Sequence, residues 1–89
     1  MNSLNTSMNE ETEKLKLFLI NQLTESVLDI TFDKVDGTTR TMRCTLDPNI
    51  TGANFIDTTG GDRLHVWDTK AGGWRTVNVD TVTTFVPVE

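Results

Sequence analysis

Side chains that could do chemistry concentrate between residues 63 and 80, which hold both tryptophans and the only histidine of the chain. The most suggestive cluster comprises His65, Trp67, Trp74 and Asn78. Exposed indole rings can stack on nucleic-acid bases, and a histidine or asparagine beside them can hydrogen-bond the base edges. The simpler alternative is that the tryptophans cover the sheet against an N-terminal helix or a neighbouring subunit. The residue types alone favour this alternative.

Arginines form the second candidate group, and all four are expected on or beside strands: Arg40, Arg43, Arg63 and Arg75. They could form a small anion site, and we include Arg43 and Arg75 among the candidate binding residues. Local pairing with Asp29, Asp62 and Asp68 is the simpler interpretation. Exposed ion pairs of this kind contribute less than ~1 kcal/mol.

Catalysis and metal binding have little support in the residue types. The single cysteine, Cys44, falls at an inward position of a predicted strand, whereas the base that would activate it, His65, falls on an outward face. One histidine and one cysteine do not make a structural zinc site. The acidic residues are scattered, and the glycines match no phosphate-binding loop. The sequence therefore predicts no catalytic residue, no metal and no cofactor, in a protein that is not an enzyme.

A β-hairpin must position the candidate cluster. The runs 64–67 and 76–79 alternate apolar residues with polar or aromatic ones, and strict alternation is typical of a half-buried strand. A four-residue loop, 70–73, joins them, with Gly72 and Gly73 at positive-φ positions. This register places both tryptophans on the outer face as diagonal neighbours. The pairs that it implies are Thr69–Trp74, Asp68–Arg75, Trp67–Thr76, Val66–Val77 and Leu64–Val79.

A second hairpin is predicted from Val27 to Leu46. A two-residue turn at Asp36 and Gly37 would put its two apolar sets on opposite faces, and a change of one residue corrects this. We therefore predict a three-residue loop, 35–37, with Gly37 in the left-handed conformation of a bulged turn. The pairs that follow are Leu28–Cys44, Asp29–Arg43, Ile30–Met42 and Thr31–Thr41.

An amphipathic helix is predicted from about residue 9 to residue 24. Ser7 and Asn9 compete as N-cap residues, and glutamates crowd the first turn, where the helix dipole favours negative charge. The apolar stripe should cover an open end or edge of the sheet, and a dimer contact is the alternative. Its members, at helical spacing, are Leu15, Leu17, Phe18, Leu19, Ile20 and Leu23.

The remaining segments are a long loop and a final strand. Residues 47–62 contain a proline and three glycines, which favour a loop that is functional or partly structured. Ile50, Phe55 and Ile56 are expected to pack back onto the core. Residues 82–88 form the last strand, at an edge or a strand end, because Pro87 cannot donate a backbone hydrogen bond.

Composition restricts the class of protein. At 89 residues the chain forms one domain. A net charge of −5 argues against a general DNA-coating protein, although it leaves room for a local basic spot. The single cysteine allows no internal disulfide and suits a reducing cytoplasm. No apolar run reaches the ~18 residues of a membrane span, and residues 1–8 lack the pattern of a signal peptide.

The predicted fold class is mainly β (α+β). We expect an N-terminal amphipathic helix and a small five-stranded antiparallel barrel of the SH3-like or Sm-like kind. A flexible N-terminus, residues 1–8, would precede a single domain over residues 9–89, with the helix at 9–24 and the barrel at 26–88.

Two segments resemble a family of small tailed-bacteriophage proteins described as WYL-like. The first runs from Phe32 to Leu46, and the second contains Val66-Trp67-Asp68 and continues from Trp74 to Val82. The resemblance covers about residues 27–83 with both motifs in the expected order, and the N-terminal helix lies outside it. It implies a β-barrel of the Sm-like or SH3-like kind.

Larger WYL domains, found in bacterial transcription regulators, bind nucleic acids or nucleotide-like ligands, so the resemblance implies such a ligand. Their last strand often carries arginines around a hydrophobic-Asp-Arg pattern. Asp80 matches the acidic position, whereas Asn78 and Thr81 stand where arginine is more typical. This departure weakens the expectation of phosphate binding.

Residues and resemblance together predict a non-enzymatic phage accessory protein in the cytoplasm of an infected bacterium. It would act as a binding module on a host or phage protein, without a membrane association. A nucleotide- or nucleic-acid-binding module is one alternative, and a self-assembling Sm-like homo-oligomer is another. The candidate binding residues are His65, Trp67, Trp74, Asn78, Arg43 and Arg75.

Overall fold

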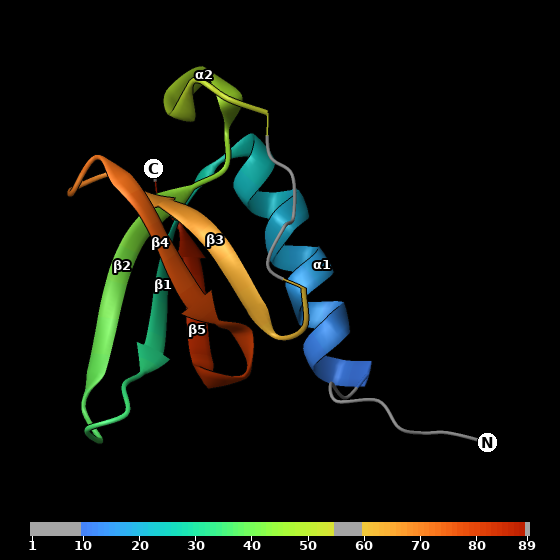
Figure 1. Ribbon diagram of the computed structural model, residues 1–89, viewed down its shortest axis with the longest axis vertical. Coiled ribbons are helices and arrows are strands. Elements are labelled where there is room, and N and C mark those ends of the chain that lie inside the picture. The colour runs from blue at the N-terminus through green and yellow to red at the C-terminus, as the bar shows by residue number, and fades with distance from the viewer. Residues whose placement is uncertain (1–9, 55–59, 89) are drawn as a thin grey trace.

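The computed structural model describes residues 10–54 and 60–88, and Figure 1 shows their arrangement. The predicted N-terminal helix and five antiparallel strands are confirmed. The elements are α1 (Glu10–Glu25), β1 (Val27–Asp33), β2 (Thr39–Thr45), α2 (Pro48–Thr51), β3 (Arg63–Asp68), β4 (Gly73–Asn78), the 3₁₀ helix η1 (Val79–Thr81) and β5 (Val82–Pro87).

The strands lie in the order β4-β3-β2-β1-β5, so β4 and β5 are the two edges of the sheet. The sheet is strongly bent, and α1 runs along one side of it (Figure 1). Among the described strands β4 and β5 do not pair with each other, so the barrel is open along this seam. A second weak line lies between β2 and β3, where the ladder has two residue pairs, Cys44–Asp68 and Thr45–Trp67.

The β1–β2 hairpin has the predicted register. Gly37 closes its turn with a φ of 90°, in the left-handed region, and its N–H donates to the Lys34 carbonyl at 3.0 Å. The predicted outward pair of Thr31 and Thr41 is also present, with a 2.8 Å hydrogen bond between the two hydroxyls. The predicted inward pairs are observed and buried: Leu28–Cys44 and Ile30–Met42.

The predicted register of the β3–β4 hairpin is wrong by two residues. Trp67 lies directly opposite Trp74 instead of Thr76. The loop starts one residue earlier than expected, with Gly72 at a φ of 68°, and Gly73 is already the first residue of β4. Because side chains alternate along a strand with a period of two, a shift of two residues leaves every side chain on its predicted face.

The C-terminal strand occupies an edge, as predicted. β5 pairs with β1, and Pro87 lies opposite Leu28 at the end of the ladder. The predicted strand run 76–79 extends one residue too far, because β4 ends at Asn78. Residues 79–81 form η1 instead, and this tight turn carries the chain from one edge of the sheet to the other.

Helix α1 packs on its own sheet, as predicted over the dimer alternative. Leu19 and Leu23 are fully buried and belong to the core formed by the inward residues of the strands. The Leu23 carbonyl accepts the Leu46 N–H at 2.8 Å and the Thr45 hydroxyl at 3.1 Å, which fixes the end of the helix to β2. Lys16 is also buried, and its Nζ donates to the Gly61 carbonyl at 3.0 Å.

Parts of the predicted apolar stripe remain at the surface. Leu17 and Phe18 are exposed, and the ring of Phe18 lies 5.6 Å from that of Phe85 on β5. The competing N-cap residues, Ser7 and Asn9, lie outside the described residues.

The segment after β2 begins with the short helix α2. The Asp47 carboxylate accepts the Asn49 N–H at 2.9 Å and caps the helix, and Gly52 ends it with a φ of 80°. The expectation that Ile50 packs onto the core is wrong, because α2 stands away from the sheet (Figure 1) and leaves this side chain 46% exposed. The predictions for Phe55 and Ile56 lie outside the described residues.

Candidate functional site

The outer face of the β3–β4 hairpin brings four predicted site residues together. His65 and Trp67 on β3, and Trp74 and Asn78 on β4, occupy outward positions of one unbroken register. We call this surface the tryptophan face. The sheet stabilises it from behind, where the opposite face of the same hairpin contributes three buried residues to the core: Leu64, Val66 and Val77.

The two indole rings of the tryptophan face contact each other. Their centroids are 5.4 Å apart with an interplanar angle of 84°, the edge-to-face arrangement that aromatic pairs favour. Trp67 is partly buried between Trp74 and Thr45, whose hydroxyl donates to the Ser26 carbonyl at 2.9 Å at the end of α1. Trp74 lies on the edge strand and is 43% exposed. One ring is therefore anchored, and the other is presented to solvent.

Arg75 does not belong to the tryptophan face. It lies opposite Val66 on the core side of the hairpin, at the open end of the sheet. Its Nε is 4.0 Å from Oδ2 of Asp68, and Nη2 of Arg40 is 3.7 Å from the same oxygen. The local pairing of Arg75 with Asp68 is therefore observed, as a diagonal contact.

Asp68 is a nearly buried carboxylate, with 3% of its surface exposed. Its Oδ1 accepts the backbone N–H of Lys70 at 2.9 Å and that of Ala71 at 3.0 Å. The hydrogen bond from Ala71 is the main cause that lowers the pKa of Asp68, against the opposing effect of burial. The hydrogen bond from the Lys70 backbone N–H and the charges of Arg75 and Arg40 lower this pKa further. The carboxylate thus closes the β3–β4 turn and holds two arginines beside it.

Arg43 lies on the outer side of β2 and binds Asp29 of β1 through two hydrogen bonds, Nε–Oδ1 at 3.0 Å and Nη2–Oδ2 at 3.2 Å. The hydrogen bond from Arg43 lowers the pKa of Asp29. This is the local pairing that the sequence favours. With Thr41 and Lys70, the pair borders a pocket of about 310 Å³.

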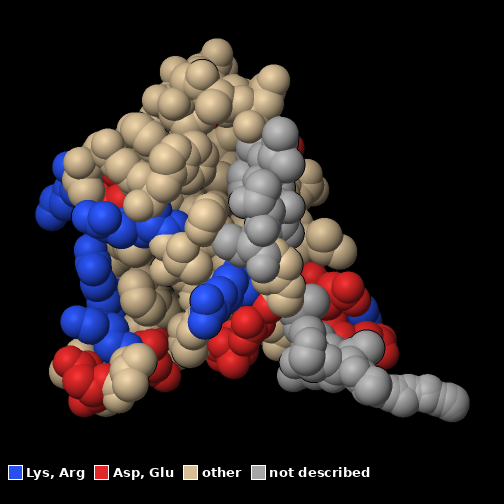
Figure 2. Space-filling view, in the orientation of Figure 1, with Lys and Arg blue, Asp and Glu red and all other residues tan. Residues whose placement is uncertain are grey.

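Basic side chains gather around the β3–β4 turn, with Arg40 and Arg75 on the core side of the sheet and Arg43 on its outer side. Figure 2 shows Lys and Arg over β2 and the turn between β3 and β4, with acidic residues at the β1–β2 turn. We call the four basic residues the cationic patch: Arg40, Arg43, Lys70 and Arg75. Two carboxylates, Asp29 and Asp68, lie among them. The patch is a local basic spot in a chain of net charge −5.

Cys44 is buried on the core side of β2, as predicted, whereas His65 lies at an outward position of β3. Burial raises the pKa of the Cys44 thiol to about 12, with smaller effects of the Asp68 and Asp29 charges. A thiol that stays protonated at neutral pH is a poor nucleophile and a poor metal ligand. Within residues 10–54 and 60–88, no group of three or more His, Cys, Asp or Glu side chains could hold a metal ion.

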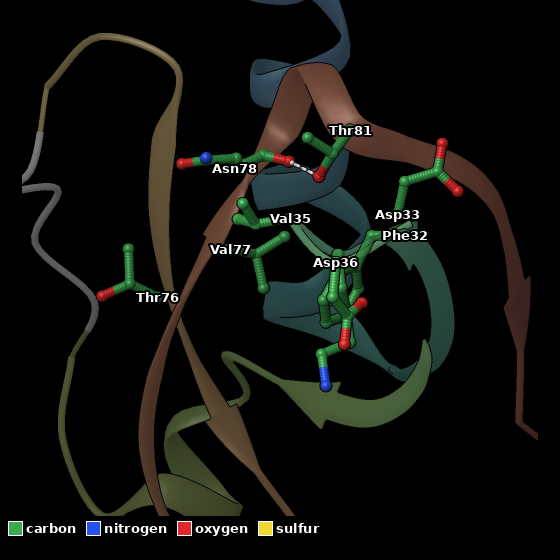
Figure 3. Close-up of a pocket in the computed structure, with 9 residues that line it drawn as sticks. Phe32, Asp33, Val35, Asp36, Thr76, Val77, Asn78 and Thr81 are labelled. Carbon is green, nitrogen blue, oxygen red and sulfur yellow. Dashed lines mark hydrogen bonds between the residues drawn. The ribbon is translucent and has the colours of Figure 1, made fainter. Parts of the chain in front are cut away.

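A pocket of about 510 Å³, which sequence reasoning missed, lies between β4 and the β1–β2 turn. It is lined by residues 32–36, by residues 76–78 and by Thr81. In Figure 3, Val77 lies on the pocket side of β4 near Val35, and the Asn78 carbonyl accepts the Thr81 hydroxyl at 2.7 Å. The pocket depends on how the first hairpin bends toward β4, and no local sequence signal encodes that bend.

The sequence from residue 17 to residue 83 matches a family model, WYL_2, whose description is an Sm-like SH3 β-barrel fold. The chain belongs to the WYL_2 family. No curated protein and no solved structure matches it. The family assignment and the observed helix and strands agree on the predicted SH3-like, Sm-like architecture. Because the WYL_2 match starts inside α1, the expectation that the helix lies outside the resemblance is wrong for residues 17–25.

The structure shows where two residues of this WYL_2 chain lie that depart from the pattern of larger WYL domains. Asn78 and Thr81, which stand where larger WYL domains typically carry arginine, line the 510 Å³ pocket. Asn78 therefore borders both this pocket and the tryptophan face. No helix within the described residues combines the length and apolar content that a bilayer crossing requires.

Proposed function

We propose that this WYL_2 domain is a non-catalytic binding module whose tryptophan face binds a host or phage protein. The observation that carries the proposal is the exposure of Trp74, a large ring held edge-on against Trp67 at the sheet edge. Aromatic residues are enriched at the centres of protein interfaces, where a few of them supply most of the binding free energy. A ring that is already held in place loses little conformational entropy on binding.

The residues around Trp74 suit a protein partner. His65 offers a hydrogen-bonding group one same-face position from the ring pair, Asn78 offers another further along the same face, and the cationic patch lies around the β3–β4 turn that follows Trp67. Polar and charged groups at the rim of an interface mainly set orientation and association rate. We therefore expect the indole rings to supply affinity and the cationic patch to favour a partner with acidic residues near its apolar contact.

The Trp74→Ala variant tests this proposal. We expect at least about a tenfold loss of affinity for the captured partner, because truncation of a central aromatic removes about 2 kcal/mol or more. The measurement is a pull-down from an infected bacterial lysate, followed by titration of the identified protein. Ile50→Ala is the matched control, because Ile50 is an apolar residue of similar exposure, 46%, on α2.

The control should bind like the wild type, and both variants should keep the circular dichroism and melting temperature of the folded domain. Unchanged binding of Trp74→Ala would contradict the proposal. Unfolding of Trp74→Ala would instead assign the rings to stability, which is the simpler interpretation of the sequence.

A nucleotide- or nucleic-acid-binding module is the second candidate function, and the basic side chains around the turn of the hairpin that carries both indole rings favour it (Figure 2). Bases could stack on Trp74 while the basic side chains neutralise phosphates. Binding of a fluorescent single-stranded oligonucleotide should then weaken steadily as salt is raised, since neutralised phosphates release counterions. An oligonucleotide that fails to bind at low salt removes this candidate.

We further propose that the domain is an accessory protein of a tailed bacteriophage and acts in the cytoplasm of the infected bacterium. The support is the likeness of residues 32–46 and 66–82 to small tailed-phage proteins. The pull-down described above tests this too, because the captured partner should be a host or phage protein of that compartment. A partner from another compartment would contradict it.

A further inference from the structure

Among the described strands, β4 pairs with β3 alone, so its other edge carries backbone hydrogen-bonding groups without a strand partner. The Val79 N–H donates to the Asp62 carbonyl at 2.7 Å, which extends the β3–β4 ladder by one hydrogen-bonded pair. Hydrogen-bonded and non-hydrogen-bonded pairs alternate in an antiparallel ladder, so the backbone groups of Trp74, Thr76 and Asn78 point away from β3. The Asn78 carbonyl is already taken by Thr81. Along the rest of this edge no described strand pairs with β4.

The two edges of the sheet differ in whether a further strand, from another molecule, could pair with them. On β5, the Val88 N–H donates to the Val27 carbonyl at 2.9 Å, so by the same alternation Pro87 stands at an outward position, where it offers no N–H. A register shift at Thr31 and Phe32 further distorts that edge. β4 contains no proline and keeps an unbroken register over six pairs. Proline and bulges are the usual devices that block an edge, and β4 lacks both.

The 510 Å³ pocket adjoins this same edge. Thr76 and Asn78 belong to one face of β4 and Val77 to the other, yet all three line the pocket. A pocket bordered by both faces of a strand lies against its backbone edge. Its far wall is Phe32 and the β1–β2 turn, where Val35 is fully exposed (Figure 3). The pocket therefore lies where a side chain would be placed by a further strand that paired with the edge of β4.

The charged residues around the pocket indicate which kind of peptide could bind there. Asp33 and Asp36 border the pocket with a single opposing cation, Lys34. Asp36 accepts hydrogen bonds from the Thr38 N–H at 3.0 Å and hydroxyl at 2.7 Å, which hold its carboxylate at the turn. We propose that β4 binds an extended peptide of a partner by strand addition, with an aliphatic side chain in the pocket and lysine or arginine next to it. This site uses the backbone edge of β4 and not the indole rings, and it does not rest on the function proposed for them.

Strand addition combines main-chain hydrogen bonds, which supply affinity, with alternate side-chain pockets, which supply specificity. The probe is a capped peptide that alternates valine with lysine, and its counterpart alternates valine with glutamate. With the full chain, the basic peptide should shift the amide resonances of Trp74 and Thr76 and slow their hydrogen exchange. The acidic peptide should bind at least about tenfold more weakly, because its carboxylates meet those of the pocket.

Thr76→Pro against Thr76→Val is the decisive pair of variants. Proline at this outward position removes a donor from the free edge and no donor from the β3 ladder, whereas valine keeps the N–H. We expect Thr76→Pro to weaken binding of the basic peptide at least about tenfold, the effect of losing a main-chain hydrogen bond and its geometry. Thr76→Val should bind like the wild type. Asp33→Lys should weaken binding without affecting the edge.

Three results would overturn the proposal. One is equal binding of the peptide by Thr76→Pro and Thr76→Val, and another is a response confined to the indole resonances. The third is a concentration-dependent mass of the free protein that Thr76→Pro abolishes, which would assign the edge to a second copy of the chain. If Thr76→Pro fails to fold, a probe N-methylated at alternate residues replaces it. Retained affinity of that probe would equally exclude strand addition.

Discussion

Asp68 is the residue that decides where the β3–β4 turn closes. Its carboxylate accepts two backbone N–H groups of the turn, at Lys70 and Ala71, and faces Arg40 and Arg75. An aspartate that bonds the backbone two residues on is a known turn-forming pattern. This pattern is visible in the sequence and predicts the observed loop better than the glycine pair does, because Gly73 has no positive φ.

Asp68→Ala and Asp68→Asn separate the two roles of this side chain. Alanine removes the charged acceptor of two part-buried backbone N–H groups and should lower the free energy of unfolding by about 1–3 kcal/mol. Asparagine keeps an acceptor for these donors and loses only the attraction to the arginines, so its effect should be smaller. Urea unfolding at neutral pH measures both, and an alanine variant as stable as the wild type would contradict this role.

The pH dependence of these variants follows from the lowered pKa of Asp68, whose ordinary value is 3.8. Because the folded state holds this carboxylate ionised, its stabilising effect is fully present above the unfolded pKa and is lost as the pH falls through the folded pKa. The stability difference between wild type and Asp68→Asn should therefore stay constant from neutral pH to about pH 5 and shrink below about pH 4. A difference that persists unchanged at pH 2 would exclude the linkage.

At the scale of elements, the alternation of apolar and polar residues predicted which face of the sheet each side chain occupies. It did not always predict which residues pair across a hairpin. In β1–β2 a single glycine at the bulge position and complementary outward pairs, Asp29–Arg43 and Thr31–Thr41, select one pairing. In β3–β4 two registers that differ by two residues both keep Leu64 inward, and the local residues separate them poorly. The tryptophan face was predictable for this reason, although the direct contact of its rings was not.

Structural features formed by segments far apart in the sequence could not be predicted from the local residue pattern. The 510 Å³ pocket needs the β1–β2 turn to bend toward β4, and η1 needs the chain to cross between the two edges. Arg75 was predicted among the binding residues, although strand alternation places it on the face of Val77, opposite to the tryptophans, in the predicted register as in the observed one. The helix stripe was recognised as a whole, while its division into buried Leu19 and exposed Leu17 depends on tertiary packing.

The glycine of the β1–β2 turn offers a test at the element scale. Gly37→Ala should destabilise the domain by about 1 kcal/mol or more, because a φ of 90° strains an L-residue even where space is open. Gly73→Ala is the control, since Gly73 has open space and no positive φ. It should be neutral or slightly stabilising. Equal melting temperatures for the two variants would show that the turn adapts without strain.

For the whole molecule, the packing of α1 unites the strands. Its Leu19 and Leu23 contact one core that includes residues of β1, β2, β3 and β4. The WYL_2 match begins within this helix, at residue 17, in agreement with its place in the core. The helix therefore belongs to the barrel as a structural element, and the surfaces proposed above for partners lie on the strands and their turns.

The short ladder between β2 and β3 has a consequence for motion. Two residue pairs join these strands, supplemented by the Thr69 N–H and hydroxyl, which both donate to the Arg43 carbonyl at 3.0 and 3.1 Å. The sheet thus consists of two parts, β1-β2-β5 and β3-β4, which are joined by this short ladder. In native-state hydrogen exchange the Thr69 amide should open at a lower free energy than the Ile30 amide within the first part. Equal opening free energies would mean that the two parts of the sheet separate only in global unfolding. A lower value for Thr69 would mean that the β3–β4 hairpin can move as a unit, together with its indole rings and its free edge.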